Sequence, residues 1–311
     1  MNADIMALCN TLVYDGHLRC GSRNVAVARL ALPHYPHALR TPQAAGLGDR
    51  TACAAVGGVD ACAAAGWLEH ALSPNQPVLF LNTDSLVPGR RFLEHRQGSS
   101  DRSSSSRGGS GPVGNAVEAA LVADLCAWLL RCGLPPEELG VCSPYRAQLA
   151  AVKHELRRSL RAAGCPGLRS GVDAPGDWRS LLGRIEVKTV DKFQGRDKAC
   201  LVVSTVHSNA SGEVGTLLDD KRRVNVLLSR AKHKLLLVGS AATLSAAKAG
   251  GAAQAGASPG PGVGSAAAAP GGAAGGQPPA PRPSISADLM ELLRSKNLVV
   301  DLAPGAHEGL L

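Results

Sequence analysis

Three clusters of polar and charged residues in this 311-residue chain carry side chains that could bind phosphates or nucleic acid. The densest cluster runs from Thr189 to Lys198 and gathers Asp, Lys, Gln and Arg side chains around Gly195. It lies between two short apolar runs, and a purely structural loop rarely concentrates so many charges around a glycine. We therefore favour a functional loop over the alternative, which is an ion-paired turn.

The second cluster, SPYRAQ (143–148), follows an apolar run and opens a helical pattern. Ser143 can cap that helix, and the free N–H groups of a helix N-terminus can bind phosphate. A plain capped turn between strand and helix is equally compatible with this spacing, so both interpretations stay open.

The third cluster, DDKRRVNVLLSRAK (219–232), combines an apolar helical face with a row of cations. Arg223 and Arg230 are seven residues apart, so they share one face of the predicted helix. A solvated basic surface is the ordinary explanation of such a run. Here, however, the next strand begins almost at once, which places Arg230 near the end of the sheet, where it could reach a ligand.

The elements that must position these clusters alternate between short apolar runs and helical patterns. Asn115 followed by Glu118 resembles a capping box at the start of one helix. Alternation of this kind predicts an α/β fold with a mainly parallel sheet flanked by helices, whose ligands bind beyond the carboxyl ends of the strands. The predicted strands are 77–82, 140–144, 185–190, 200–206, 234–240 and 298–302, and the predicted helices are 115–132, 145–161, 219–232 and 285–296.

The composition predicts a small aliphatic core interrupted by segments that do not pack. Hydrophobic residues make up 45% of the chain but aromatic residues only 3%, whereas Gly (36) and Pro (20) are abundant. Segments rich in Ala, Gly, Pro and Ser cannot bury enough apolar surface to offset the entropy lost on ordering. We predict disordered insertions at 41–66, 98–111, 163–183 and 249–283.

Charge and cysteine usage exclude several classes of protein. The net charge of +8 is compatible with a polyanionic partner. The nine cysteines include no Cys-x-x-Cys pair, so neither a zinc ribbon nor a disulfide framework is expected, and we predict no metal site. No apolar stretch reaches the roughly 18 residues of a membrane helix, and the N-terminus does not resemble a signal peptide.

In this order, the three clusters resemble motifs IV, V and VI of superfamily 1B helicases, the group that includes the nonsense-mediated-decay RNA helicase. VDKFQGRDK, LLDDKRRVNV and SRAKHKLLLVGS are similar to the C-terminal part of the eukaryotic DNA replication ATP-dependent helicase/nuclease family. The opening MNADIMALCNTLVYDGHLRCGS and FLNTD (80–84) share this likeness. The resemblance implies a RecA-like, P-loop-type domain.

The resemblance also implies roles in an ATP site that lies between two RecA-like domains. It makes Arg230 the catalytic arginine finger, which would reach the γ-phosphate of ATP. Asp197 would lie near the ribose and Gly195 near the phosphates, with Arg146 and Gln148 near the cleft.

A second set of residues is implied to lie along a single-stranded nucleic-acid track. Ser143 and Tyr145 of motif IV and Thr189, Val190 and Asp191 of motif V belong to it. Tyr145 could stack on a base or serve only as a packing residue.

The chain departs from the family by lacking a Gly-x-x-x-x-Gly-Lys-Ser/Thr motif and an Asp-Glu-Ala strand for magnesium. Most of the site for ATP with Mg²⁺ is therefore expected on a missing upstream domain, together with the nuclease carboxylates and any iron–sulfur cysteines. We expect Met1 to be an internal methionine of a truncated product or an incomplete gene model. We also expect the isolated chain to be inactive.

These expectations divide the chain into segments around one motor domain. Residues 1–40 would continue from the missing first RecA-like domain, and 67–248 would form the second. After the linker 249–283, residues 284–311 would complete the domain with a helix and a strand.

The predicted function is the C-terminal motor of an ATP-dependent DNA helicase/nuclease that acts on single-stranded or flap DNA in replication and repair. Its partners would be replication and single-strand-binding proteins, in the nucleus and, as a second compartment, the mitochondrion, with no membrane association. Two alternatives stay open: an RNA helicase of the same superfamily, and a non-catalytic nucleic-acid-binding fragment.

Overall fold

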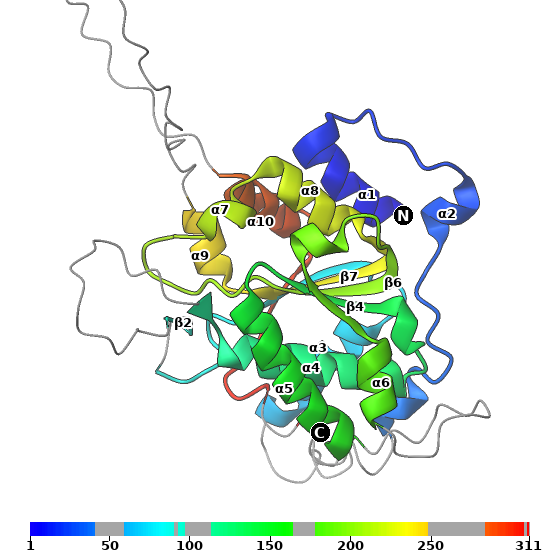
Figure 1. The fold of residues 1–311 in the computed structure, drawn as a ribbon, viewed down its shortest axis with the longest axis vertical. Coiled ribbons are helices and arrows are strands. Elements are labelled where there is room, and N and C mark those ends of the chain that lie inside the picture. The colour runs from blue at the N-terminus through cyan, green and yellow to red at the C-terminus, as the bar shows by residue number, and fades with distance from the viewer. Residues whose placement is uncertain are drawn as a thin grey trace, which may run out of the picture.

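A six-stranded sheet forms the centre of the protein (Figure 1). The computed structural model describes residues 1–40, 59–89, 93–96, 113–163, 178–247, 284–307 and 310. All pairings within this sheet are parallel, in the order β5-β4-β6-β7-β1-β8, which confirms the expected α/β, RecA-like class. The strands are β1 (Val78–Asn82), β4 (Leu139–Ser143), β5 (Glu186–Thr189), β6 (Lys198–Ser204), β7 (Ala231–Gly239) and β8 (Val299–Asp301).

One face of the sheet is covered by α3 (Val59–Leu72), α4 (Ala116–Arg131), α5 (Arg146–Ala162) and α6 (Trp178–Arg184) (Figure 1). In helix α4, which confirms the helix predicted over 115–132, nearly every residue from Glu118 to Leu130 is buried. The reason is that α4 packs on the sheet and on α5, and also receives the C-terminal segment around Leu310. It is therefore a core helix, which is hydrophobic all round.

The opposite face carries a second set of short helices around another apolar cluster. The sequence patterns did not predict α1, whose N-cap Asn2 accepts a hydrogen bond from the Asp4 N–H and ties the N-terminus to β7 through Lys232 O. The helices are α1 (Ala3–Cys9) with the π-helical turn η1 (Asn10–Tyr14), η6 (Val190–Phe193), α7 (Gly215–Leu218), α8 (Lys221–Ser229), α9 (Ala241–Ala246) and α10 (Ile285–Ser295).

The remaining described elements are short. Three of them are short helices: α2 (Arg23–Val27), η2 (His37–Arg40) and η5 (Pro136–Glu138). Strands β2 (His95–Arg96) and β3 (Val113–Gly114) form an antiparallel ribbon beside the main sheet. No helix among the described residues is long and apolar enough to cross a bilayer.

Three expected boundaries need correction. Helix α3 begins at Val59, inside the predicted insertion 41–66, because Ala-rich sequence is also the best helix former. Helix α6 begins at Trp178, inside the predicted insertion 163–183. The single helix expected over 219–232 is broken, because the Asp220 carboxylate caps α8 and β7 already begins at Ala231. Residues 41–58, 98–111, 164–177 and 249–283 lie outside the described part of the chain.

Two buried polar contacts tie distant parts of the chain to the core. Trp128, which is fully buried in α4, donates its indole N–H to the Leu310 carbonyl at 2.9 Å. Lys234, buried in β7, donates from Nζ to the carbonyls of Ser73 (2.8 Å) and Gln76 (2.6 Å), just beyond α3. Burial lowers the pKa of this lysine to about 8.

Replacing Trp128 by Phe leaves the buried Leu310 carbonyl without its donor, which we expect to lower the free energy of unfolding by about 1–3 kcal/mol. Trp67→Phe is the matched control, because Trp67 is also buried but its Nε1 has no acceptor among the described residues. Urea unfolding of both variants measures the difference. Equal losses would show that the hydrogen bond to Leu310 contributes nothing.

Candidate functional site

Three of the expected nucleotide-binding residues meet at the amino edge of the sheet. Asp197 directly precedes β6 and Arg230 directly precedes β7, and the first residues of these strands, Lys198 and Ala231, are paired, with a register shift before the next pair, Cys200 and Lys234. Arg230 Nη1 lies 2.7 Å from Asp197 Oδ1. Gly195 lies two residues before Asp197 in the same loop. The tertiary structure therefore joins motifs V and VI through an ion pair.

The Arg230 guanidinium is held by the end of its own helix as well as by Asp197. Arg230 is the C-cap residue of α8, and it donates from Nε to Val226 O (3.3 Å) and from Nη2 to Ser229 Oγ (3.1 Å). Its side chain is 21% exposed and that of Asp197 is 48% exposed, so solvent and ligands can reach the pair. A guanidinium is always charged and can bind phosphate oxygens through two parallel hydrogen bonds.

Gly195 occupies a turn that requires glycine. Its φ of +75° lies in the left-handed region, and an added Cβ would meet no atom within 4 Å. The constraint is therefore conformational, because the space beside the backbone is open.

The ion-paired-turn interpretation holds for two cations of the same loop. Arg196 (2.8 Å) and Lys198 (3.0 Å) both pair with Glu186 at the start of β5, and Lys188 contacts it too. Burial raises the pKa of Glu186, but the contacts with Lys188 and Lys198 outweigh burial and hold it at about 2. These cations therefore stabilise the loop around Asp197.

The motif V segment crosses one face of the sheet between its two edges. Thr189 ends β5 at the carboxyl edge, and Val190 and Phe193 are then buried in the apolar cluster, with exposures of 1% and 0%. Asp191 is 64% exposed and lies 3.6 Å from Arg223 Nε. Helix α8 thus holds this segment at two points, through Asp191 and through Asp197.

Of the expected nucleic-acid residues, Ser143, Tyr145 and Thr189 lie at the other edge. Ser143 and Thr189 are register partners at the carboxyl ends of β4 and β5. A five-residue strand spans roughly 13 Å at 3.3 Å per residue. Arg146, the first residue of α5, is exposed at this carboxyl edge, so the structure does not bring it to Asp197 and Arg230.

The expectation that Ser143 caps α5 is wrong. The N-cap position is occupied by Tyr145, whose side chain makes no capping hydrogen bond, because Pro144 and Tyr145 separate Ser143 from the first turn. Ser143 is fully buried, and its Oγ has no hydrogen-bond partner among the described residues.

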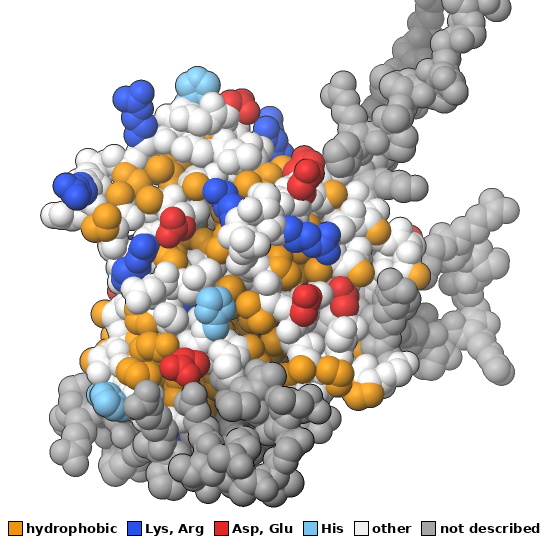
Figure 2. All heavy atoms as spheres, turned by 180° about the vertical axis from the view of Figure 1, so that it is seen from behind, with side chains coloured by type: hydrophobic (Ala, Val, Ile, Leu, Met, Phe, Trp, Pro, Cys, Tyr) orange, Lys and Arg blue, Asp and Glu red, His pale blue; other side chains and the backbone are white. Residues whose placement is uncertain are grey.

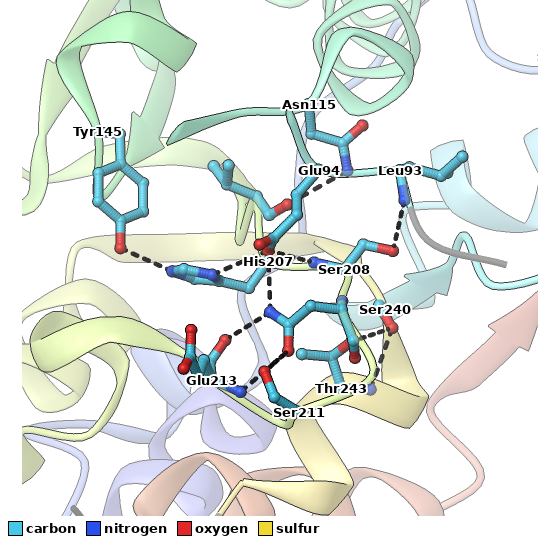
Figure 3. Close-up of polar contacts among 12 residues, drawn as sticks. Leu93, Glu94, Asn115, Tyr145, His207, Ser208, Ser211, Glu213, Ser240 and Thr243 are labelled. Atoms are coloured by element: carbon cyan, nitrogen blue, oxygen red, sulfur yellow. Dashed lines mark hydrogen bonds and ion pairs between the residues drawn. The ribbon is translucent and has the colours of Figure 1, made fainter. Parts of the chain in front are cut away.

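Tyr145 is fixed by a chain of side chains that the sequence did not reveal (Figure 3). Its hydroxyl lies 2.6 Å from His207 Nε2, and His207 Nδ1 lies 3.2 Å from Glu94 Oε2. The two rings meet edge to face, with centroids 5.3 Å apart. A Cβ at Gly215, where φ is +68°, would lie 2.3 Å from the Tyr145 hydroxyl, so only glycine fits there.

Glu94 is the acidic residue in this row of hydrogen-bonded side chains. Besides His207, it accepts hydrogen bonds from the Ser208 N–H (3.1 Å) and from Asn209 Nδ2 (2.9 Å). Burial raises the pKa of Glu94, but these hydrogen bonds outweigh it and hold the pKa at about 2. The carboxylate is therefore ionised at neutral pH.

A second acidic residue, Glu118, is wholly buried near these hydrogen-bonded side chains. Asn115 Oδ1 caps α4 at the Glu118 N–H (3.1 Å), as the sequence predicts. Glu118 in turn accepts from Asn115 Nδ2 (3.0 Å), Ser204 Oγ (2.6 Å) and the Val206 N–H (2.9 Å). Burial raises the pKa of Glu118 to about 8.

Gln148 completes this buried network and is not at a cleft as expected. It is fully buried, accepts from the Asn115 N–H at 2.8 Å and donates from Nε2 to Asn115 O and Ser204 Oγ. The amide therefore bridges α4, α5 and β6 beneath Tyr145.

Val206 supplies the bend that orients His207. Its φ of +71° is an outlier for a β-branched residue, which costs of order 1–3 kcal/mol. Hydrogen bonds from the Val206 N–H to Glu118 and from Asn115 Nδ2 to Val206 O (3.3 Å) hold this conformation. Sequence reasoning missed Glu94 and His207 because they are 113 residues apart and belong to no local pattern.

Glu118→Gln tests the buried carboxylate through the pH dependence of stability. Because the pKa is about 8 when folded and about 4.3 when unfolded, the folded chain holds an extra proton between these values, so stability falls as pH rises from about 4.3 to about 8 and levels off above it. Between pH 6.5 and 8 we expect a loss of up to about 1.4 kcal/mol per pH unit, which Glu118→Gln removes.

Glu291→Gln on the exposed side of α10 is the control and should keep the slope of the unaltered chain. The carboxylates of Glu94 and Glu186 lose their contribution only as pH falls towards 2, so they do not act in this window. Lys234, whose pKa is also about 8, contributes equally in all three chains, so the difference between their slopes reports Glu118. Denaturant unfolding at several pH values gives the slopes. Identical slopes for Glu118→Gln and the unaltered chain would contradict the prediction.

Comparison with known proteins shows the family of this chain. The family described as "AAA domain" matches residues 1–242. The protein named DNA replication ATP-dependent helicase/nuclease DNA2 from Mus musculus is 38% identical over 245 residues, which cover 78% of this chain and 18% of that relative.

Proteins of the same name from other organisms are also similar to this chain. The Bos taurus protein is 32% identical over 311 residues, covering 100% of this chain and 21% of the relative. The Saccharomyces cerevisiae protein is 31% identical over 246 residues, covering 79% and 13%. The chain thus spans about a fifth or less of the length of these relatives. Since the family match covers most of its length and all three motif clusters, the chain belongs to the AAA domain family.

Proposed function

We propose that this chain is the C-terminal motor domain of an ATP-dependent DNA helicase/nuclease that acts on single-stranded DNA in replication and repair. The observation that carries the proposal is the contact of Arg230 with Asp197 at the amino edge, within a family whose relatives are named as ATP-dependent helicase/nucleases. A separate carboxyl edge with Tyr145 and Thr189 would leave room for a nucleic-acid strand.

The residues at the amino edge fit a nucleotide phosphate. ATP with Mg²⁺ would supply the phosphoanhydride bond that is hydrolysed. Arg230 would exchange the Asp197 carboxylate for phosphate oxygens and act as the arginine finger, an effect worth about 10³–10⁵ in rate. Asp197, released from that pair, would be free to accept hydrogen bonds from the ribose hydroxyls, and Gly195 leaves open space for phosphates.

At the carboxyl edge, direct contact with a strand is proposed for Tyr145 and Thr189. The Tyr145 ring, held at its hydroxyl by His207, would stack on a base. Ser143 and Val190 are buried, so their part would be to shape this edge from below. Asp191 would act through Arg223, which it faces.

The motif V segment would couple the two edges. It begins with Thr189 beside the proposed strand and ends with Asp197 beside the proposed phosphate. A change of partner at Arg230 would therefore act on a short segment whose other end contacts DNA. That arrangement is what a motor needs to link hydrolysis to movement along a strand.

Arg230→Ala in the full-length protein should lower kcat for ATP hydrolysis by about 10³-fold or more, because transition-state charge loses its partner. Nucleotide binding, measured by fluorescent-ATP titration, should change little. Arg222→Ala, an exposed cation on the same helix, is the matched control. The isolated 311-residue chain should show no turnover. Unchanged kcat in Arg230→Ala would overturn the finger assignment, and turnover by the isolated chain would contradict the expectation that most of the ATP site lies on another domain.

Tyr145→Ala should weaken binding of oligo-deoxythymidine to this chain by about 5- to 150-fold, the loss of one stacked base at about 1–3 kcal/mol. Tyr145→Phe keeps the ring but loses the hydrogen bond to His207, so it should lie between Tyr145→Ala and the unaltered chain. Fluorescence anisotropy gives the dissociation constants. Equal affinity for all three would exclude stacking, and a preference for oligo-uridine would support the RNA-helicase alternative.

A further inference from the structure

Helix α5 carries an exposed row of cations that the proposed sites do not use. Arg146, Lys153, Arg157 and Arg161 are all exposed. Their spacings of seven, four and four residues return to the same helix face, so they form one stripe, which we call the α5 ridge. The neighbouring side of α5 is apolar and packs on the core through Leu149, Val152, Leu156 and Leu160.

The α5 ridge is a concentration of one sign of charge. The only acidic residue of α5 is Glu155, and its carboxylate pairs with Arg158 (2.9 Å), outside the ridge. Cations at four-residue spacing repel one another and destabilise a helix, so the row has a cost within the chain itself. On the face opposite to that of Figure 1, by contrast, basic and acidic side chains are interspersed (Figure 2).

Aromatic rings stand at both ends of the α5 ridge. Tyr145 immediately precedes it at the carboxyl edge of the sheet. At the other end, Arg161 lies 5.5 Å and Arg179 lies 5.0 Å from the ring centroid of Trp178, which is half-buried. The ridge spans roughly 22 Å at 1.5 Å per residue. Cations in a row with aromatic rings are the combination that binds single strands through their phosphates and bases.

We propose that the α5 ridge binds the phosphates of a single DNA strand that continues from Tyr145 along α5 to Trp178. The proposal rests on the proposed function, because it extends the strand site at the carboxyl edge. The ridge would contribute through charge and would be indifferent to base sequence. Its cations would release counterions from the bound strand, so its contribution should appear in the salt dependence of binding.

The test measures binding of a fluorescent twenty-nucleotide oligo-deoxythymidine to the 311-residue chain over a series of NaCl concentrations. In K153Q/R157Q/R161Q, the slope of log affinity against log salt should become shallower by about 2, which is about 0.7 for each lost phosphate contact. These side chains are exposed, so the variant keeps its core. R157K/R161K keeps the charges and should keep the slope.

A charge-matched control removes three cations elsewhere. R19Q/R294Q/K296Q loses the same net charge from exposed positions, two of them at α10 on the other face of the sheet, and should leave the slope unchanged. An unaltered slope in the ridge variant, or an equal change in this control, would overturn the proposal. If the unaltered chain does not bind the oligonucleotide at all, the proposed function itself fails. If Tyr145→Ala weakens binding while the ridge variant keeps its slope, only the ridge proposal fails.

Tryptophan fluorescence gives a second readout. The chain has three tryptophans, and Trp67 and Trp128 are buried in the core, whereas Trp178 is the half-buried one beside Arg161. Quenching by the oligonucleotide should disappear in Trp178→Phe and weaken in K153Q/R157Q/R161Q. Full quenching in Trp178→Phe would place the strand away from this end of α5.

Discussion

Parallel strands place all their amino ends at one edge of a sheet and all their carboxyl ends at the other, and the placement of the candidate site residues depends on that separation. Arg230 and Asp197 directly precede β7 and β6, whereas Ser143 and Thr189 end β4 and β5. Roughly 13 Å of strand lies between the edges. A nucleotide and a nucleic-acid strand could therefore be bound at once without competing for the same side chains.

The carboxyl edge is stabilised by groups that are individually unfavourable. A buried carboxylate at Glu118 and a left-handed conformation at Val206 both cost free energy, yet each satisfies the other, because the Val206 N–H donates to Glu118. This arrangement turns the chain after β6 and presents His207 to Tyr145 and Glu94. Strain of this kind persists only where the surrounding contacts over-determine it. The result is an aromatic ring whose position is fixed at its polar end.

Charge is distributed differently at the amino edge of the sheet and on α5. At the amino edge, cations are neutralised locally: Glu186 binds Arg196 and Lys198, and Asp197 binds Arg230. On α5 the cations stand in a row with one acid among them, and that acid already has a partner. Part of the positive charge behind the net +8 is therefore concentrated on α5. Paired cations can exchange partners, whereas a row of like charges attracts a polyanion over its whole length.

The sequence by itself determined the six strands of the main sheet, the helices α4, α5 and α10, the parallel α/β class and the three clusters, because apolar periodicity and capping are local properties. It also predicted the Asn115 cap and identified Arg230 and Asp197 through their motifs. Only the tertiary structure decided that these two form one ion pair, that Arg146 lies at the opposite edge, and that Ser143 and Gln148 are buried. The contacts from Glu94 through His207 to Tyr145 could likewise not be predicted, since these residues become neighbours only when β2 and β6 are placed in the fold. Short-range patterns fix where a strand begins and ends, but which distant side chains become neighbours depends on the order of strands in the sheet.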